Sequence, residues 1–421
     1  MNSNGVYDDG DVPLARWYFE LVRDDGTVYC GYTDEYGELV LTVNRSGMYT
    51  LTETVQDGWT PINPASGMAY VNVVSGTEVP VQMFGNFHDV TITVFKFEDM
   101  DGDGRYDEED AGLEGWEFVV TGPWSGSGAV IVTGPDGYAS IVVDRAGDYL
   151  VAEVVQDGWT PTTATSAGVP VLSGDCPNPV MFGNFEDITV LVFKYEDVNS
   201  NGVYDAGDVP LPDWTIMMCS DDYGTELTGV TGPDGYATFV LEAGGLWEIR
   251  ELLPDDGWCQ ISPATGTYQY LAVSGDEPGV FEFGNYRCVT IDVFKYEDVN
   301  SNGVYDDGDV PLAGWYFELV DSSGAVYNYD WTDETGHLQF TVCEYDTWTV
   351  VEEDRKGWTH INPASGTLTV DTPSGVAPDT LEFGNFRDVI IVVFKYHDRD
   401  SDGVYDGGIY PGADEPVEGW M

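Results

Sequence analysis

Basic residues are scarce in this chain of 421 residues. Lysine and arginine together number 15, against 75 aspartate and glutamate residues, so the formal net charge is −60. A field of this sign repels phosphate backbones and anionic headgroups, which argues against nucleic acid or an anionic membrane surface as a partner. Long apolar runs are absent too, since no stretch approaches the roughly 18 residues of a membrane helix. We therefore expect no membrane insertion within this sequence.

Cysteine and histidine are also rare. Six cysteines and four histidines make neither a disulfide-dense framework nor a CxxC zinc motif. Cys219 and Cys259 fall in one repeat and can pair, whereas the other four can be bridges, interchain links or free thiols. No Ser/His/Asp set, phosphate-binding loop or open metal site with a base is recognisable, so we expect no enzymatic activity.

The composition that remains favours a folded β protein. Apolar residues make up 42% and aromatic residues 14% of the chain, too much for a disordered acidic segment. The 51 glycines and 22 prolines, together with many Val, Thr, Tyr and Trp residues, favour short strands joined by tight turns. No segment shows a helical apolar period with caps. About seven short strands per 100 residues are typical of a β-sandwich, which we predict.

The chain repeats itself. The sequence Phe-Gly-Asn, followed by an aromatic residue, begins at Phe84, Phe182, Phe283 and Phe383, at spacings of 98 to 101 residues. A unit this long is a whole domain, and linkers of about three residues predict a stiff rod. The predicted repeats are 1–88, which lacks its first strand, then 89–186, 187–287 and 288–387, and finally 388–421, the first strand and acidic loop of a fifth. From this phase we expect the chain to be a segment of a longer repeat protein.

The acidic loop 99–110 has the ligand spacing of an EF-hand. Side-chain oxygens fall at loop positions 1, 3, 5, 9 and 12, with a glycine (Gly104) at position 6 and a backbone carbonyl at position 7. Oxygen-only ligands on a flexible loop favour Ca²⁺ over Zn²⁺ or Mg²⁺. We therefore predict a structural calcium site formed by Asp99, Asp101, Asp103, the Arg105 carbonyl, Asp107 and Asp110.

Four further copies of this loop occur. The complete ones comprise Asp197, Asn199, Asn201, the Val203 carbonyl, Asp205 and Asp208, and Asp298, Asn300, Asn302, the Val304 carbonyl, Asp306 and Asp309. The first copy lacks position 1 and leaves Asn2, Asn4, the Val6 carbonyl, Asp8 and Asp11. The last has five inserted residues before its final acid and comprises Asp398, Asp400, Asp402, the Val404 carbonyl, Asp406 and Asp414. An Asx-rich turn that only ends a strand does not need oxygens at five fixed positions, so the recurrence favours calcium.

Three polar residues recur where a sheet core is expected. Four of the five lysines lie near the end of a first strand, on the face that alternation assigns to the core: Lys96, Lys194, Lys295 and Lys395. A glutamate precedes each Gly-Trp turn, at Glu53, Glu153, Glu251 and Glu352, and an asparagine ends each last strand, at Asn86, Asn184, Asn285 and Asn385. Burying a lysine is costly without a partner, so these positions require a chemical explanation.

Tryptophan recurs in two series. We interpret the first as core residues or a lid beside the acidic loop (Trp17, Trp116, Trp214, Trp315 and Trp420), and the second as turn-packing residues (Trp59, Trp159, Trp258 and Trp358). A sugar-stacking platform is the less favoured interpretation of these side chains.

In combination, these motifs resemble a known family. The acidic loop followed by Pro-Leu-x-x-Trp, the Glu before Gly-Trp and the terminal Phe-Gly-Asn are similar to the SdrD B-like and Cna B-type domains of cell-surface proteins. The resemblance covers all four repeats and the fifth fragment. It implies a prealbumin-like (Ig-like) β-sandwich, of the kind used in surface stalks, adhesins and pili, and an extracellular location.

The resemblance also implies a cross-link. In many Cna B-type domains a first-strand lysine and a last-strand asparagine form an isopeptide bond, assisted by a glutamate. The complete triads here would be Lys96, Glu153 and Asn184; Lys194, Glu251 and Asn285; and Lys295, Glu352 and Asn385. In the alternative state, lysine and glutamate form a buried ion pair and asparagine satisfies the remaining hydrogen bonds. Glu53 and Asn86 lack their lysine in this sequence, and Lys395 lacks its partners.

These observations predict a structural role. We expect a segment of a long, calcium-stabilised extracellular fibre or cell-surface stalk, with neighbouring copies of the same chain as partners. The alternative function is an adhesin-type module that binds a protein or a glycan.

Overall fold

The computed structural model describes residues 2–123, 128–220, 224–254, 257–399, 401–407 and 413–417. Within these ranges the regular elements are all β-strands, and no helix there is long and apolar enough to cross a membrane. The predicted all-β class is confirmed. The repeats are numbered first to fifth by their predicted ranges.

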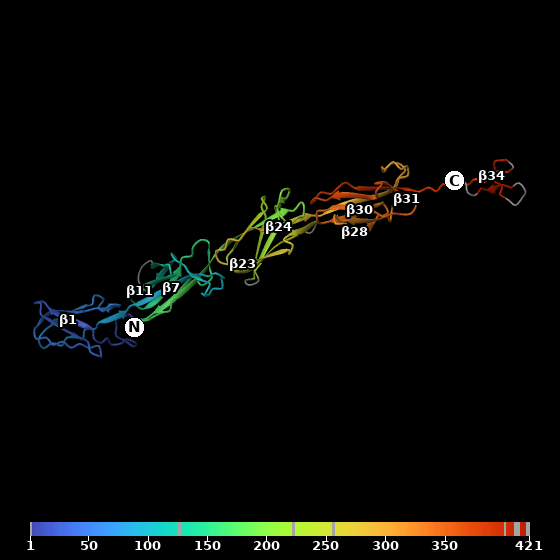
Figure 1. Cartoon of the computed structure of the whole chain (residues 1–421). Helices are drawn as coiled ribbons and strands as arrows, with labels where there is room; N and C mark the ends of the chain where they lie inside the picture. Colours follow the sequence, from blue (N-terminus) through green and yellow to red (C-terminus); the bar gives the residue numbers. More distant parts are fainter. Residues whose placement is uncertain are drawn as a thin grey trace.

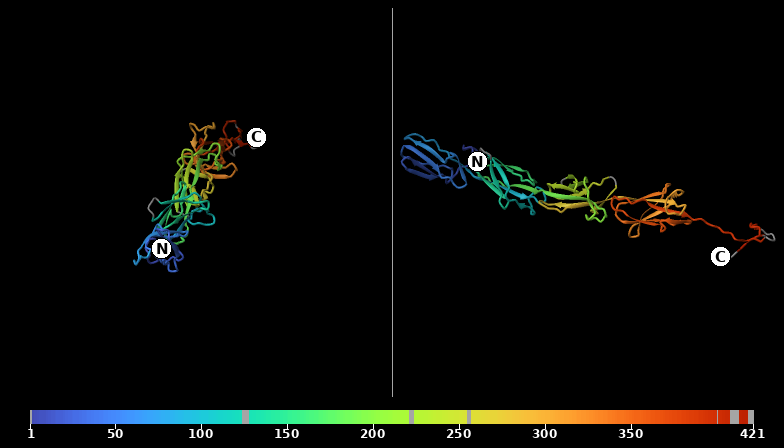
Figure 2. Two further views of the ribbon diagram at one scale, coloured as in Figure 1. Left: turned by 90° about the vertical axis from the view of Figure 1, so that its left-hand side faces the viewer. Right: turned by 90° about the horizontal axis from the view of Figure 1, so that it is seen from above.

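The repeats follow one another along an elongated array (Figure 1). The view from above shows the same succession of sandwiches (Figure 2, right). The N-terminal residues lie at the junction of the first and second repeats, where Ser3 Oγ accepts a hydrogen bond from Ala146 N at 2.8 Å. The acidic loop that begins the first repeat therefore faces the second repeat.

The second repeat is a complete sandwich. Its strands are β7 (Val90–Glu98), β8 (Ala111–Gly112), β9 (Glu117–Thr121), β10 (Ala129–Val132), β11 (Tyr138–Val143), β12 (Gly147–Glu153), β13 (Trp159–Pro161), β14 (Ser166–Val171) and β15 (Val180–Glu186). One sheet has the order β10-β9-β12-β14, and the other has the order β11-β7-β15-β13 with β8 paired to β7. The first strand, β7, lies between antiparallel β11 and parallel β15 and so connects the two halves of its sheet.

The third and fourth repeats have the same arrangement. The third contains β16 (Ile188–Glu196), β17 (Val209–Pro210), β18 (Thr215–Ser220), β19 (Thr225–Val230), β20 (Tyr236–Leu241), β21 (Gly245–Glu251), β22 (Trp258–Ser262), β23 (Thr267–Ala272) and β24 (Phe281–Arg287). The fourth contains β25 (Val289–Glu297), β26 (Val310–Pro311), β27 (Tyr316–Val320), β28 (Val326–Trp331), β29 (His337–Val342), β30 (Thr347–Glu352), β31 (Trp358–Asn362), β32 (Thr367–Asp371) and β33 (Leu381–Arg387). Their first strands, β16 and β25, lie between an antiparallel and a parallel neighbour as β7 does.

The first repeat has one intact sheet. Its strands are β1 (Tyr18–Arg23), β2 (Val28–Tyr32), β3 (Gly47–Glu53), β4 (Trp59–Asn63), β5 (Met68–Val73) and β6 (Gly85–His88). The sheet β2-β1-β3-β5 matches those of the other repeats, whereas the opposite sheet consists only of β4 and β6. Segments 38–43 and 82–84, which correspond to β11 and the start of β15, do not form strands. The position between them is the one that β7 occupies in the second repeat.

The fifth repeat begins with an extended segment, 389–395, that has the sequence of a first strand. Its residues from Val389 to Val393 are 72–86% exposed. The two short strands that follow, β34 (Tyr396–His397) and β35 (Glu415–Pro416), pair only with each other. Figure 1 shows the segment leaving the fourth repeat and ending at this small hairpin.

Alternation along the strands fills the cores. In β7, Val90, Ile92 and Val94 are at most 1% exposed and pack with Phe118 of the opposite sheet in one cluster, as period-2 patterning requires. The first tryptophan series is buried within the described residues, as expected for core positions. Each member packs edge-on against a turn tryptophan at 5.2–5.3 Å, in the pairs Trp17–Trp59, Trp116–Trp159, Trp214–Trp258 and Trp315–Trp358. Trp420 lies outside the described residues.

The cysteines pair differently from the suggested Cys219–Cys259 bridge. Cys288 forms a disulfide with Cys343, while Cys219 and Cys259 are both free. The suggested bridge fails because Cys219 lies on β18, on the half-exposed face of one sheet, and Cys259 lies on β22 in the other sheet. The sulfur of Cys259 instead lies 3.6 Å from that of Cys288.

Candidate calcium loops and buried lysine–glutamate pairs

The acidic loop of the second repeat directly follows β7. Asp99 is fully buried, and its carboxylate accepts hydrogen bonds from the backbone amides of Gly102 (2.8 Å), Asp103 (3.1 Å) and Gly104 (2.8 Å). Gly104 has a φ of 79°, which glycine adopts without strain. A Cβ at this position would lie 2.9 Å from the carbonyl oxygen of Thr162. The sharp turn at loop position 6 therefore requires glycine.

Three carboxylates converge inside this turn. Carboxylate oxygens of Asp99, Asp101 and Asp103 lie within 4.8 Å of one another. Burial, followed by the charges of the neighbouring Asp103 and Asp99, raises the pKa of Asp101. A divalent cation would offset the repulsion between these groups, and the donors are all hard oxygens of the kind that calcium prefers. The residues present therefore fit a calcium ion.

Asp110 closes the loop at its far end. Its Oδ1 accepts a hydrogen bond from Met100 N and its Oδ2 accepts one from Asp107 N, both at 2.9 Å. Burial raises the pKa of Asp110, and the neighbouring carboxylates Asp99 and Asp107 raise it further. The last predicted ligand is thus tied to both the beginning and the middle of the loop.

The loop of the third repeat has the same hydrogen bonds. Asp197 is fully buried and accepts from Gly202 N at 2.7 Å, while Asp208 accepts from Val198 N at 3.0 Å and from Asp205 N at 2.8 Å. Burial raises the pKa of Asp197. In the fourth repeat, Asp298 likewise accepts from Gly303 N. Asp309 accepts from Val299 N and from Asp306 N.

Asparagines replace two carboxylates in these loops. Asn201 Oδ1 accepts from Val203 N at 2.8 Å, and Asn201 Nδ2 donates to Asp205 at 2.7 Å. Asn199 donates to the same carboxylate at 3.4 Å. Coordination of a cation would exchange these amide–carboxylate hydrogen bonds for bonds to the amide oxygens. The same pattern recurs at Asn300, Asn302 and Asp306, and at Asn2, Asn4 and Asp8.

The two end copies of the loop differ in completeness. In the first, Asp8 N donates to Asp11 Oδ2 at 3.1 Å, as its counterparts do. In the last, Asp414 is 3% exposed and accepts from Arg399 N at 2.9 Å and from Asp406 N at 3.4 Å. These contacts match those of Asp110, so Asp414 takes the final position despite the inserted residues. Asp400 lies outside the described residues, and Asp398 and Asp402 accept amide hydrogen bonds within the loop.

The position-7 residues have exposed side chains, and a tyrosine follows each of them. Val6, Val203, Val304 and Val404 are 58–64% exposed, and Arg105 is exposed as well, so only the backbone can contribute a ligand. Tyr106 packs edge-on against Phe95 of the first strand at 4.8 Å. The equivalent residues Tyr204, Tyr305 and Tyr405 do the same at 4.6–4.9 Å. Sequence reasoning missed this anchor, although the tyrosine recurs in every loop.

One serine in each of the second, third and fourth repeats ties that repeat to the one before it: Ser173, Ser274 and Ser374. Glu186, at the end of β15, donates its backbone amide to Ser274 Oγ at 2.7 Å, and Ser274 Oγ donates to Glu98 at 2.8 Å. The amide of the same serine donates to the carbonyl of Met100, the residue that follows Asp99, at 2.9 Å. The acidic loop of the second repeat is therefore in direct contact with the third. Sequence reasoning did not identify these serines.

This junction occurs three times along the chain. The backbone amide at the end of the last strand donates to a serine hydroxyl at 2.7 Å in the pairs His88–Ser173, Glu186–Ser274 and Arg287–Ser374. Ser374 N also donates to Val198 O at 3.1 Å, and Ser200 Oγ of the third acidic loop accepts from Tyr345 N of the fourth repeat at 2.8 Å.

The three complete lysine–glutamate pairs are buried. The Nζ–carboxylate distances are 3.3 Å for Lys96–Glu153, 3.2 Å for Lys194–Glu251 and 3.1 Å for Lys295–Glu352, and at most 1% of any of these side chains is exposed. Burial lowers the pKa of each lysine to about 8 despite the neighbouring carboxylate. Burial likewise raises the pKa of Glu251 and Glu352. Both shifts favour the neutral forms, as desolvation does.

The asparagines lie next to these pairs. Lys96 pairs with Phe182 across the parallel strands, and Asn184 lies two residues further on, on the same face by alternation. Each lysine Nζ donates to the carbonyl of the phenylalanine opposite, at 3.0–3.3 Å. Asn385 Nδ2 donates to Glu352 at 2.5 Å. The structure thus brings the predicted triads together, with the glutamate within hydrogen-bonding distance of both other residues in the fourth repeat.

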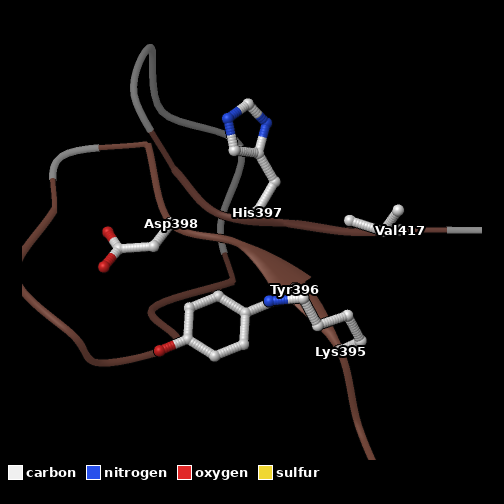
Figure 3. Close-up of a pocket in the computed structure, with 5 residues that line it drawn as sticks. All are labelled: Lys395, Tyr396, His397, Asp398 and Val417. Atoms are coloured by element: carbon white, nitrogen blue, oxygen red, sulfur yellow. The ribbon is translucent and has the colours of Figure 1, made fainter.

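The first repeat contains the glutamate and the asparagine without a lysine. Glu53 is 5% exposed and its Oε2 accepts from Trp17 Nε1 at 2.9 Å. Burial raises the pKa of Glu53, and the nearby Asn86 opposes this shift. Lys395 of the fifth repeat is exposed. Figure 3 shows it at the start of the last acidic loop, before Tyr396, His397 and Asp398.

Comparison with known proteins finds sequence similarity to serine-aspartate repeat-containing proteins. No protein-family model matches the chain. Serine-aspartate repeat-containing protein F of Staphylococcus epidermidis is 22% identical over 408 residues, covering 87% of this chain and 24% of the relative. Serine-aspartate repeat-containing protein D of Staphylococcus aureus strain Newman is 23% identical over 346 residues, covering 74% of this chain and 26% of the relative. The chain thus spans about a quarter of the length of the relatives it matches.

Solved structures give weaker matches. The Bacillus anthracis TIE protein has a TM-score of 0.30 at 14% identity, over 90% of this chain and 69% of that protein. The major pilin SpaD of Corynebacterium diphtheriae has a TM-score of 0.28 at 13% identity, over 71% and 97%. These scores are too low to carry an argument. The sequence similarity to the serine-aspartate repeat proteins confirms the resemblance to SdrD B-like repeats and supports an extracellular, cell-surface location.

Proposed function

We propose that the chain is a structural segment of a long, calcium-stabilised extracellular fibre or cell-surface stalk. The observation that carries the proposal is the direct contact that the acidic loops of the second and third repeats make with the repeat that follows each of them. Met100 and Val198 follow the first predicted ligands of the second and third loops, and the carbonyl of each accepts a hydrogen bond from the backbone amide of a junction serine. A cation that orders such a loop therefore also orders the junction.

Each loop holds several carboxylates close together next to a junction, and a bound Ca²⁺ would offset their repulsion and fix the backbone that contacts the next repeat. Because binding to the folded state stabilises it by mass action, calcium should raise both the melting temperature and the stiffness of the array.

A variant at position 9 tests this function. Asp205→Ala removes one predicted ligand, whose side chain is exposed, and should abolish the calcium-induced rise in melting temperature of the third repeat. Glu226→Ala, an exposed acid on β19 of the same repeat, serves as the matched control and should leave that rise unchanged. Equal calcium responses of the two variants would contradict a metal site in this loop.

We further propose that the buried triads become isopeptide bonds. A lysine with a pKa lowered to about 8 is a better nucleophile at neutral pH. Its neutral amine would attack the carboxamide carbon of Asn285, the neighbouring Glu251 would relay the proton, and ammonia would leave. Intact mass measured on the denatured chain decides the matter, since each bond removes the mass of one ammonia.

A second function, adhesion, is favoured by one surface feature. All six residues of β28 are exposed, and Tyr329 and Trp331 on this strand are 55% and 52% exposed with their rings 5.8 Å apart. Exposed aromatic rings are a common platform for sugars and for protein partners. Binding of a glycan or protein by the native chain, and its loss in Trp331→Ala, would support adhesion. Equal binding by both proteins would count against this strand.

A further inference from the structure

We propose that the junction between the third and fourth repeats carries an internal thiol–disulfide exchange site. In this exchange the free thiol of Cys259 attacks Cys288, a Cys259–Cys288 bridge forms, and Cys343 is released as the new free thiol. The bridge then closes a loop in the third repeat instead of the fourth. The inference goes beyond the proposed fibre function and does not depend on calcium.

Three cysteines meet at this junction. Cys288 is the one residue between β24, the last strand of the third repeat, and β25, the first strand of the fourth. Its sulfur is bonded to that of Cys343 and lies 3.6 Å from the sulfur of Cys259. All three sulfurs lie within 4.8 Å of one another, and all three residues are partly exposed. The cluster therefore places a free thiol in contact with a disulfide, which is what exchange requires.

On the side of the third repeat, strand pairing brings Cys259 to Cys288. Cys259 lies on β22 opposite Tyr286 of β24. The backbone amide of Cys288 donates to the carbonyl of Gly257 at 2.7 Å and so extends this ladder. Because Tyr286 and Cys288 are two residues apart, their side chains lie on the same face of the sheet as that of Cys259. Diagonal neighbours of this kind are close enough for their side chains to interact.

On the side of the fourth repeat, Cys288 lies opposite Cys343 at the end of another ladder. The antiparallel pairing of β25 with β29 begins at Val289 and Val342, and the two cysteines are the next residues outward. Cys288 thus has one possible partner in each repeat. Moving the bridge changes the sequence separation that it spans from 55 residues in the fourth repeat to 29 residues in the third.

The contact between the positions of Cys259 and Cys288 recurs at the three other junctions, where other side chains make it. A threonine hydroxyl donates to an aspartate carboxylate at 2.7–2.9 Å in the pairs Thr60–Asp89, Thr160–Asp187 and Thr359–Asp388. The positions are equivalent, because the amide of each aspartate donates to the carbonyl of the glycine before the turn tryptophan, as the amide of Cys288 does. The fold therefore holds these two side chains in contact, and at this junction both are thiol-bearing residues.

The third position of the cluster differs in the same way. The residues equivalent to Cys343 in the second and third repeats are Asp144 and Glu242, which follow the ends of β11 and β20 as Cys343 follows the end of β29. Three positions that carry hydroxyl or carboxylate groups in those repeats thus carry sulfur at this one junction. Two cysteines suffice for a structural bridge, so the third one in contact with it is the observation that carries the inference.

The exchange is balanced without an external oxidant or reductant. The Cys259 thiol loses its proton to solvent and its thiolate attacks Cys288. The Cys259–Cys288 bond forms as the Cys288–Cys343 bond breaks, and Cys343 leaves as a thiolate that takes up a proton. Burial raises the pKa of the Cys259 thiol, so the thiolate is scarce at neutral pH and the exchange should be slow.

The attack also requires a small movement of Cys259. Its sulfur must approach that of Cys288 by about 1.5 Å to reach bonding distance. Since all three sulfurs lie within 4.8 Å of one another, they form a triangle, and the Cys259 side chain must rotate to approach along the Cys288–Cys343 bond. Both changes are within the range of a side-chain rotation in a partly exposed residue.

The exchange would move a covalent cross-link from one repeat to its neighbour. In the chain-entropy treatment, a disulfide stabilises the domain whose loop it closes by restricting the unfolded chain. The Cys288–Cys343 bridge therefore protects the fourth repeat, and the Cys259–Cys288 bridge would protect the third. Under tension the repeat without the bridge should unfold first, a consequence that rests on the proposed fibre function, whereas the exchange itself does not.

Mapping of the free thiols in the native 421-residue chain tests the exchange. Samples are kept under native conditions for several days, quenched in acid, alkylated with N-ethylmaleimide while denatured, and digested for peptide mass spectrometry. Both isomers should be present, one with Cys259 alkylated and the other with Cys343 alkylated. Cys259→Ser should abolish alkylation of Cys343. Cys219→Ser, which removes the other free thiol of the third repeat, is the matched control and should leave both isomers.

Two variants separate the two bridges. In Cys343→Ser, air oxidation should join Cys259 to Cys288, with two electrons and two protons passing to oxygen, whereas Cys259→Ser keeps the Cys288–Cys343 bridge. Calorimetry then compares the two proteins. The third repeat should melt roughly 10 °C or more higher in oxidised Cys343→Ser than in Cys259→Ser, and the fourth repeat should show the opposite difference.

Three results would overturn the proposal. They are alkylation of Cys259 in every wild-type chain with Cys343 always bridged, release of Cys288 in place of Cys343, and equal alkylation of Cys343 in wild type and Cys259→Ser. A Cys343→Ser variant whose two remaining junction cysteines stay reduced in air would also refute it. None of these substitutions touches an acidic loop, so a bridge that does not move while the calcium response persists would refute the exchange alone.

Discussion

Replacing Lys295 with methionine should severely destabilise the fourth repeat. Lys295 and Glu352 are fully buried, with Nζ and the carboxylate 3.1 Å apart, and the lysine also donates to Phe383 O at 3.0 Å. Methionine fills most of the space but leaves the carboxylate in the interior beside Asn385, which donates to it at 2.5 Å. Breaking a buried pair in this way costs about 3–5 kcal/mol.

Replacing both members of the pair should restore most of the stability. Lys295→Met combined with Glu352→Gln removes both charges and keeps the volume, so most of the lost stability should return, as is found when apolar groups replace a buried pair. Burial already raises the pKa of Glu352. In the single variant this pKa should rise further, so the destabilisation should become smaller as the pH falls and the carboxylate takes up a proton.

Calorimetric unfolding of the full chain measures both variants. Lys356→Met is the matched control, since Lys356 is an exposed lysine of the same repeat, and it should change stability by less than about 0.5 kcal/mol. Intact mass shows in parallel whether Lys295 is cross-linked in the parent chain. The reasoning fails if Lys295→Met is no worse than Lys356→Met, or if the double variant is as unstable as the single one.

Three further predictions concern pH, the junctions and the disulfide. Burial lowers the pKa of Lys194 to about 8, so in the uncross-linked chain the unfolded state binds more protons above that pH. The free energy of unfolding should then rise between about pH 8 and 10, which urea midpoints would show, and a flat profile would contradict a titrating lysine. Ser374→Ala leaves the amide of Arg287 without its hydroxyl acceptor and should lower the stability of this junction by about 1–3 kcal/mol. The amide of Arg287 should then exchange hydrogen faster in Ser374→Ala than in the control variant Ser365→Ala, and equal rates would contradict this. Reducing the Cys288–Cys343 bridge, which spans 55 residues, should destabilise the fourth repeat by about 4 kcal/mol in the chain-entropy treatment, and an unchanged melting curve would refute this.

Much of the fold follows from local sequence patterns. Alternation in segments such as 90–94 places Val90, Ile92 and Val94 on the core face, and the glycine at position 6 of each loop is required by backbone geometry. Patterns of this kind depend on residues close together in the chain, which is why the sequence predicts them. The order of strands within each sheet brings distant segments together, and local patterns did not predict it.

The parts that the sequence did not predict depend on contacts between repeats or between sheets. Ser274 is one serine among many, and only the packing of the third repeat against the loop of the second makes it a junction residue. The bridge between Cys288 and Cys343 could not be chosen over Cys219–Cys259, because the choice depends on which sheet carries each cysteine. The recurrence of Tyr106 and its equivalents is visible in the sequence. No role was predicted for it because tyrosine is not among the expected calcium ligands.

Thermal unfolding of the full chain with saturating calcium and with excess chelator tests the central claim most directly. The account predicts that calcium raises the melting temperature of the repeats whose loops carry all five side-chain ligands, and that Asp205→Ala removes this effect from the third repeat. Identical melting curves with calcium and with chelator would show that the acidic loops do not hold the array together through a bound cation.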